Sequence, residues 1–222
     1  MNRKAQGFTL VEIAIVLVII GLLLGGVLKG QELINSAKVK NFAMDFKSVP
    51  LFIYGYQDKY KALPGDDAKY AGNLGGGATA AGVTLLAPTS GTLGNGLING
   101  NYNSDIATDE SVAFWQQVRL AGLAAGPTGF ATPSADLPTN ADGGRIGIQS
   151  TAVISGMTGS YYVCSDGIQG KFAKQLDVTM DDGNTVTGSM RVAAGPFAGT
   201  PLTAVATTAV VEGTTYIVCQ AL

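Results

Sequence analysis

One segment restricts the possible folds of this chain more than any other. The run from Phe8 to Leu28 is apolar except for a single carboxylate, Glu12. At a rise of about 1.5 Å per residue, its roughly 21 residues make a helix about 30 Å long, which matches the hydrocarbon thickness of a bilayer. The preceding leader, residues 1–7, carries Arg3 and Lys4, and positive charge ahead of an apolar span holds that end in the cytoplasm. The sequence therefore predicts a helix that crosses a membrane once.

A secretory signal peptide is one competing interpretation of this segment. The apolar region of a signal peptide typically covers about 7 to 15 residues and is followed by a cleavage site with small residues. The run in this chain is longer and contains Glu12, so it fits a signal peptide poorly. An uncut single-pass anchor is another alternative, but it gives no role to Glu12.

Beyond Leu28 the helical pattern continues and becomes amphipathic through residues 29–63. Apolar positions recur at helical spacing, with lysines between them. Pro50 removes a backbone hydrogen bond and is expected to kink the helix, and the sequence Leu63-Pro64-Gly65 is expected to stop it. We expect one helix of about 50 residues, whose first half spans a membrane and whose second half packs on a globular domain.

The remaining residues, 64–222, predict the globular part of an α+β protein. Residues 66–103 are rich in Gly, Ala, Asn and Thr without a sustained period, which indicates an extended surface loop. Residues 109–123 predict a short helix capped by Thr108. An antiparallel sheet is expected to follow and to cover the soluble half of the long helix, with Asp181–Asn184 as a hairpin turn. Its predicted strands are residues 145–149, 160–164, 176–180, 185–191, 203–211 and 214–219.

Composition excludes several classes of function. The 222 residues include no His and two Cys, which leaves no Ser-His or Cys-His dyad, no His metal ligand and too few cysteines for a structural zinc site. A net charge of −2 provides no basic surface, so no direct binding of nucleic acid is expected. No nucleophile–base pair and no phosphate-binding loop is recognisable. We therefore expect neither an enzyme nor a cofactor, apart from the calcium ion considered below.

The run from Lys4 to Glu12, KAQGFTLVE, resembles the processing signature of class III signal peptides. These signals belong to type IV pilins and to the pseudopilins of type II secretion systems. The resemblance implies that prepilin peptidase cuts between Gly7 and Phe8 on the cytoplasmic side and N-methylates Phe8. It also identifies Glu12 as the acidic residue of the signature.

The same resemblance implies a pilin-like fold and a structural function. The expected role is that of a type IV pilus subunit, or the subunit of a related filament, which starts in the bacterial inner membrane with its C-terminal domain in the periplasm. Expected partners are further copies of the chain, prepilin peptidase, the inner-membrane pilus or secretion assembly machinery, and membrane lipid before assembly. Two alternatives stay open: a pseudopilin of a type II protein secretion system, and a membrane-tethered periplasmic binding domain.

Two further expectations depend on the placement of the helix in the inner membrane and of the C-terminal domain in the periplasm. A carboxylate in an apolar span costs about 2.5–3.5 kcal/mol when central, so Glu12 is expected to pair with the Phe8 amine of a neighbouring subunit during assembly. Cys164 and Cys219 lie late in the chain in strand-like surroundings, and an oxidising periplasm favours a disulfide between them. Two buried free thiols are the alternative.

Residues 99–110 are a candidate calcium loop. Asn99 stands where an EF-hand usually has Asp, and Ser104 stands where it has Gly, so an Asn-rich turn before a helix explains the same residues. Another acidic group, Asp177, Asp181 and Asp182, is expected to be a solvated turn. The candidate ligands, at EF-hand positions 1, 3, 5, 7 and 12, are Asn99, Asn101, Asn103, Asp105 and Glu110.

Overall fold

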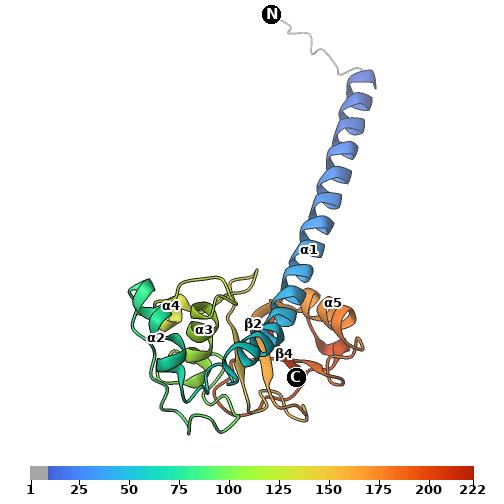
Figure 1. Cartoon of the computed structure of the whole chain (residues 1–222). Helices are drawn as coiled ribbons and strands as arrows, with labels where there is room; N and C mark the ends of the chain where they lie inside the picture. Colours follow the sequence, from blue (N-terminus) through green and yellow to red (C-terminus); the bar gives the residue numbers. More distant parts are fainter. Residues whose placement is uncertain (1–9) are drawn as a thin grey trace, which may run out of the picture. The chain divides into compact units, whose positions relative to one another are not determined.

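The computed structural model describes residues 10–222 of the chain. It divides into a first unit that ends at Lys38 and a second unit from Val39 to Leu222. One 51-residue helix, α1 (Leu10–Tyr60), contributes residues to both units (Figure 1). The predicted long helix is therefore confirmed over its described length, and it continues past Pro50 to Tyr60.

Within the second unit, α1 contributes one apolar face to the main core. The buried residues of this face recur every three or four positions, which is the spacing of one side of a helix. They share the core with α3 (Glu110–Leu120), with α5 (Gly170–Met180) and with the sheet. The ring of Phe42, for example, lies 5.9 Å from that of Phe172 on α5. The buried residues are Val39, Phe42, Ala43, Phe46, Val49, Ile53 and Tyr56.

A four-stranded antiparallel sheet in the order β1-β2-β4-β3 completes this core. Successive strand residues point to opposite faces, and both faces of the sheet are buried. Val163 and Val218 belong to the core that contains α1, whereas Cys164 and Ile217 belong to a second apolar cluster. The α+β layout is therefore confirmed. The strands are β1 (Ile146–Gln149), β2 (Tyr162–Gln169), β3 (Met190–Ala193) and β4 (Thr215–Ala221).

The predicted loop at residues 66–103 is wrong in part, because it contains a helix, α2 (Tyr70–Ala81). This helix includes the run Gly75-Gly76-Gly77, and each glycine lowers helix propensity by about 1 kcal/mol relative to alanine. Leu74 and Ala78 lie one turn apart and are both buried. Their packing in the core outweighs the poor propensity, and Gly82 ends the helix in a left-handed conformation.

The predicted strand at residues 176–180 is also wrong, since these residues form the last turns of α5. Val178 and Thr179 are β-branched and favour a strand locally. The helical pattern begins upstream, where Phe172 and Leu176 lie four residues apart and are both buried. Asp181–Asn184 therefore follows a helix and is not a hairpin turn.

The other predicted elements agree with the structure to different degrees. Residues 145–149, 160–164 and 214–219 correspond to β1, the start of β2 and β4. The segment 185–191 enters its strand only at Met190, and 203–211 contains a 3₁₀ helix, η1 (Thr207–Ala209), instead of a strand. The segment still pairs with β3 at one point, because Ala204 forms an isolated antiparallel bridge with Ala193. The hydroxyl of the buried Thr185 also donates to the Val205 carbonyl at 2.6 Å. Helix α3 is confirmed, with Asp109 rather than Thr108 as its N-cap, and the short α4 (Pro133–Asp136) follows it.

Candidate functional site

Residues 10–28 of the first unit form an exposed, apolar segment of α1. Among residues 10–222, α1 is the one helix long and apolar enough to cross a membrane, by length and composition. Its most apolar window has a mean hydropathy of 2.8, and none of that window is buried within the structure. Leu10 is 91% exposed and Leu22 is 74% exposed. An apolar surface of this extent is an interaction surface, for lipid or for other proteins.

Charged residues stand at both ends of this apolar segment. Glu12 lies in the first turn of α1, where the positive end of the helix dipole favours a carboxylate. Directly after the segment, Lys29 and Glu32 form an exposed ion pair at 2.8 Å. The predicted processing residues, Gly7 and Phe8, lie outside the described residues.

At the C-terminal end of α1, the buried carboxylate of Asp67 accepts a hydrogen bond from Tyr56. The Tyr56 hydroxyl donates to Asp67 Oδ2 at 2.8 Å, and Asn73 Nδ2 donates to the same oxygen at 2.7 Å. The backbone N–H of Lys69 donates to Asp67 Oδ1 at 2.7 Å. Asp67 is 1% exposed, so these bonds satisfy a charge that is otherwise costly to bury. Burial raises the pKa of Tyr56, and the Asp67 carboxylate raises it further.

The neighbouring Asp66 holds a different part of the chain. Its carboxylate accepts backbone N–H groups from Gly94 and Gly96, the latter at 2.7 Å. Just before it, Gly65 has a φ of 88°, and a Cβ there would lie 2.5 Å from the Glu110 carbonyl oxygen, so only glycine fits. Sequence reasoning interpreted this stretch as a helix stop alone. The two adjacent aspartates after Pro64-Gly65 could have indicated that this stretch also binds other segments of the chain.

Cys164 and Cys219 form a disulfide between β2 and β4. The two residues are direct partners in the antiparallel register, and their Cα atoms are 4.1 Å apart. Both are fully buried, in the apolar cluster on the sheet face that does not belong to the α1 core. The alternative of two free thiols does not apply to this structure.

The candidate calcium ligands at residues 99–110 are only partly brought together. Glu110 Oε2 accepts the backbone N–H of Asn99 at 2.7 Å and its side-chain amide at 2.9 Å. Burial raises the pKa of Glu110, and these two hydrogen bonds oppose that shift.

The other candidate ligands in that loop make contacts of their own. Asp105 forms an ion pair with Arg145 at 2.7 Å. The Asn103 amide donates to the Phe197 carbonyl at 3.0 Å, and the Asn101 backbone carbonyl accepts the hydroxyl of Ser111. Calcium binding at this loop stays a prediction. It requires the Asp105 carboxylate to leave its ion pair with Arg145 and to bind the ion instead.

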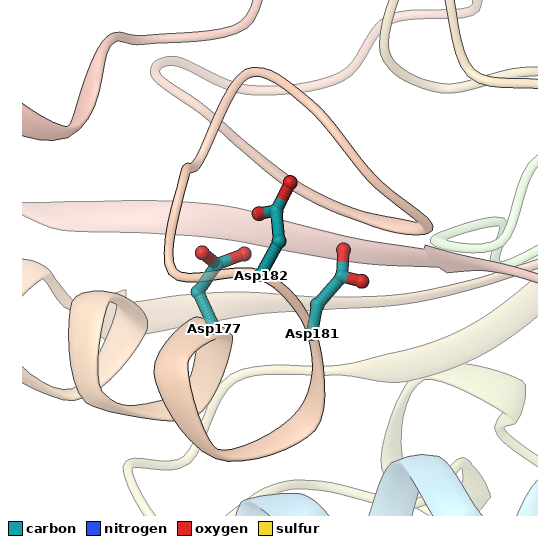
Figure 2. A group of neighbouring side chains, drawn as sticks. All are labelled: Asp177, Asp181 and Asp182. Atoms are coloured by element: carbon teal, nitrogen blue, oxygen red, sulfur yellow. The ribbon is translucent and has the colours of Figure 1, made fainter.

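The second acidic group does come together. One carboxylate oxygen from each of Asp177, Asp181 and Asp182 lies within 4.8 Å of the others (Figure 2). Asp182 is exposed, as expected for a solvated turn. Asp177 is buried instead, because it lies on the inner side of α5, next to Leu176.

Comparison with known proteins adds one finding. Residues 2–28 match the family described as the prokaryotic N-terminal methylation motif, which is the class III prepilin signal of type IV pilins and pseudopilins. No curated protein and no solved structure matches the chain. The match covers most of the predicted leader and the apolar part of α1. Together the motif and this helix fit a protein anchored in the inner membrane.

Proposed function

We propose that this chain is a prepilin, the precursor of a structural subunit of a type IV pilus or a related filament. The observation that carries the proposal is that one segment combines the methylation motif with an exposed apolar helix. Before assembly, lipid covers this helix, because its length fits the hydrocarbon layer. In the filament, the same side chains pack against other copies of the chain. This role is structural and requires no catalytic residue.

The proposed processing begins at the leader. Arg3 and Lys4 keep residues 1–7 on the cytoplasmic side, where prepilin peptidase cuts between Gly7 and Phe8 and methylates the new amine. The C-terminal domain lies in the periplasm, an oxidising compartment in which the Cys164–Cys219 disulfide persists. Mass spectrometry of the N-terminal peptide tests this order of events. A methylated Phe8 terminus is expected, whereas an intact leader or a cut beyond Leu28 contradicts the proposal.

In this proposal Glu12 selects the register of assembly. The cut creates a cationic amine at Phe8, and the Glu12 carboxylate of an incoming subunit pairs with that amine on a neighbour already in the filament. Apolar surfaces alone do not specify an axial position, whereas one charge pair in a low-dielectric layer does. Packing of the apolar side chains then supplies most of the cohesion between subunits.

The substitution Glu12→Ala tests this role, and Glu32→Ala is its matched control. Both remove one carboxylate from α1, but Glu32 lies beyond the apolar segment and pairs with Lys29 on the surface. When it is the only copy in the cell, Glu12→Ala is expected to be inserted and processed normally and to yield at least tenfold less sheared filament. The control is expected to yield normal filament. Normal yield from Glu12→Ala would refute the assembly role.

A pseudopilin of a type II secretion system shares the same motif and the same assembly physics. A deletion strain separates the two functions, because loss of surface pili supports the pilus subunit and loss of exoprotein secretion supports the pseudopilin. A membrane-tethered periplasmic binding domain predicts that no filament contains this chain. Shearing cells and pelleting filaments, followed by detection of the chain in the pellet, tests that third possibility.

A further inference from the structure

Asp177 is a buried carboxylate with too little compensation for its charge. It lies on α5 with 0% of its surface exposed, and neither Oδ1 nor Oδ2 accepts a hydrogen bond of normal geometry. Buried carboxylates normally accept several hydrogen bonds or form an ion pair, because removing them from water is costly. Such a side chain indicates that a compensating group belongs at this place.

The charges around Asp177 increase this cost. Burial raises the pKa of Asp177 to about 6, and the charges of Asp182 and Asp181 raise it as well, while the Gly183 N–H opposes the shift only in part. Among the ion pairs of the described residues, none joins a Lys or Arg to any of these three aspartates. The local charge is therefore negative and is not balanced by a side chain.

The segment after α5 directs two further carboxylates to the same place. Figure 2 shows all three side chains pointing to the same side, toward the loop that follows the helix. Met190 N donates to Asp181 Oδ2 at 2.7 Å, and the Thr187 hydroxyl donates to Asp182 Oδ2 at 2.6 Å. These bonds orient the two carboxylates, and each oxygen keeps a lone pair for another partner.

We propose that Asp177, Asp181 and Asp182 bind one calcium ion. The oxygens of the three carboxylates lie close enough to share a cation, and a set of oxygen ligands without nitrogen or sulfur selects a hard ion. Ca²⁺ accepts irregular arrangements of six to eight oxygens, with water completing the shell, whereas Mg²⁺ requires a near-ideal octahedron.

The bound ion has a structural consequence within the second unit. Asp177 belongs to α5, and Asp181 is bonded to Met190, the first residue of β3. Calcium therefore joins the end of the helix to the start of an edge strand. Extracellular calcium modules bind with dissociation constants of about 10⁻⁴ to 10⁻³ M, and we expect an affinity in that range.

Calorimetry and thermal unfolding of the full-length chain in detergent test the proposal. After removal of ions with EDTA, CaCl₂ is expected to bind saturably at the three aspartates and to raise Tm. MgCl₂ at equal concentration is expected to raise it less, and NaCl at equal ionic strength is expected to leave it unchanged. Absence of a saturable response to CaCl₂, or a response equal to that of NaCl, overturns the proposal.

Two variants and two matched controls locate the ion. Asp177→Asn and Asp182→Asn are each expected to weaken calcium binding at least tenfold. Asp182 is exposed, so its variant folds even if the buried substitution does not. Asp58→Asn, at an exposed site on α1, and Asp105→Asn, in the other candidate loop, are expected to bind normally. Unchanged binding in Asp182→Asn, or loss of binding in Asp105→Asn alone, overturns the assignment.

Discussion

The two halves of α1 are both rich in apolar side chains, but they differ in what covers them. Every residue from Leu10 to Leu28 is exposed within the structure, whereas from Val39 to Tyr56 one face is buried in the chain's own core. The first half is apolar on all sides, and the second carries one apolar stripe. A stripe can be covered by one domain, but a helix that is apolar all round needs partners on every side. The second half of α1 therefore contributes to the folding of the second unit, whereas the first half is suited to association with lipid or with other chains.

Phe42→Ala should show the largest effect on folding. Phe42 is 0% exposed, and removing a buried aromatic ring typically costs about 3–5 kcal/mol because it loses apolar burial and leaves a cavity. Trp115, the single tryptophan, is buried in the same core, so its fluorescence reports unfolding by denaturant in detergent. Leu22→Ala, in the exposed half, should change the unfolding free energy by less than about 0.5 kcal/mol. Equal effects of the two substitutions would remove the distinction between the halves.

Loss of the disulfide should weaken the second unit and leave the first unaffected. Replacing Cys164 and Cys219 together by Ser opens a loop with a sequence separation of 55, and the unfolded chain then gains conformational freedom. A destabilisation of about 2–4 kcal/mol is expected, measured as a lower denaturation midpoint of the Trp115 signal. Recovery of the protein in the membrane fraction should not change. A midpoint equal to that of the oxidised wild type would contradict this expectation.

Tyr56→Phe should have a smaller effect at the end of the helix. It removes the hydroxyl that donates to Asp67 Oδ2, although Asn73 still donates to the same oxygen. The expected loss is about 0.5–1.5 kcal/mol, the net value of one hydrogen bond. Tyr54→Phe is the matched control, since Tyr54 lies on the same helix and is 67% exposed. If both variants unfold at the same midpoint, the contact with Asp67 adds no stability.

The pH dependence of stability tests the burial of two carboxyl groups in the second unit. Burial raises the pKa of Asp45, on the soluble half of α1, to about 6, and burial with neighbouring charges raises that of Asp177 to about 6. Since both values exceed the reference value of 3.8, the associated stability is present below about pH 4 and is lost as the pH rises through about 6. Tm measured in EDTA should therefore fall between these limits. Asp45→Asn and Asp177→Asn should each flatten the profile, and a profile rising over this interval would contradict the assignment.

Local pattern was sufficient to predict α1, α3, β1 and β4. In each of these segments the apolar residues that enter the core carry the regular spacing of the element they form. It was not sufficient for α2, where three consecutive glycines hide a helix that only the burial of Leu74 and Ala78 makes stable. The last turns of α5 were missed for a similar reason, because Val178 and Thr179 suggest a strand while the helix is established upstream by Phe172.

The sequence by itself determined the apolar span, its single charge and the methylation motif, because these depend on the order of neighbouring residues. It also indicated that two late cysteines could join. Only the tertiary structure decided that Cys164 pairs with Cys219 across β2 and β4, that Asp67 accepts a hydrogen bond from Tyr56, and that the buried Asp177 lies beside two other carboxylates. These contacts join residues distant in the chain or depend on which side of a helix meets the core. The strength of these contacts depends on how far each group is buried and removed from water, and the local sequence does not determine this.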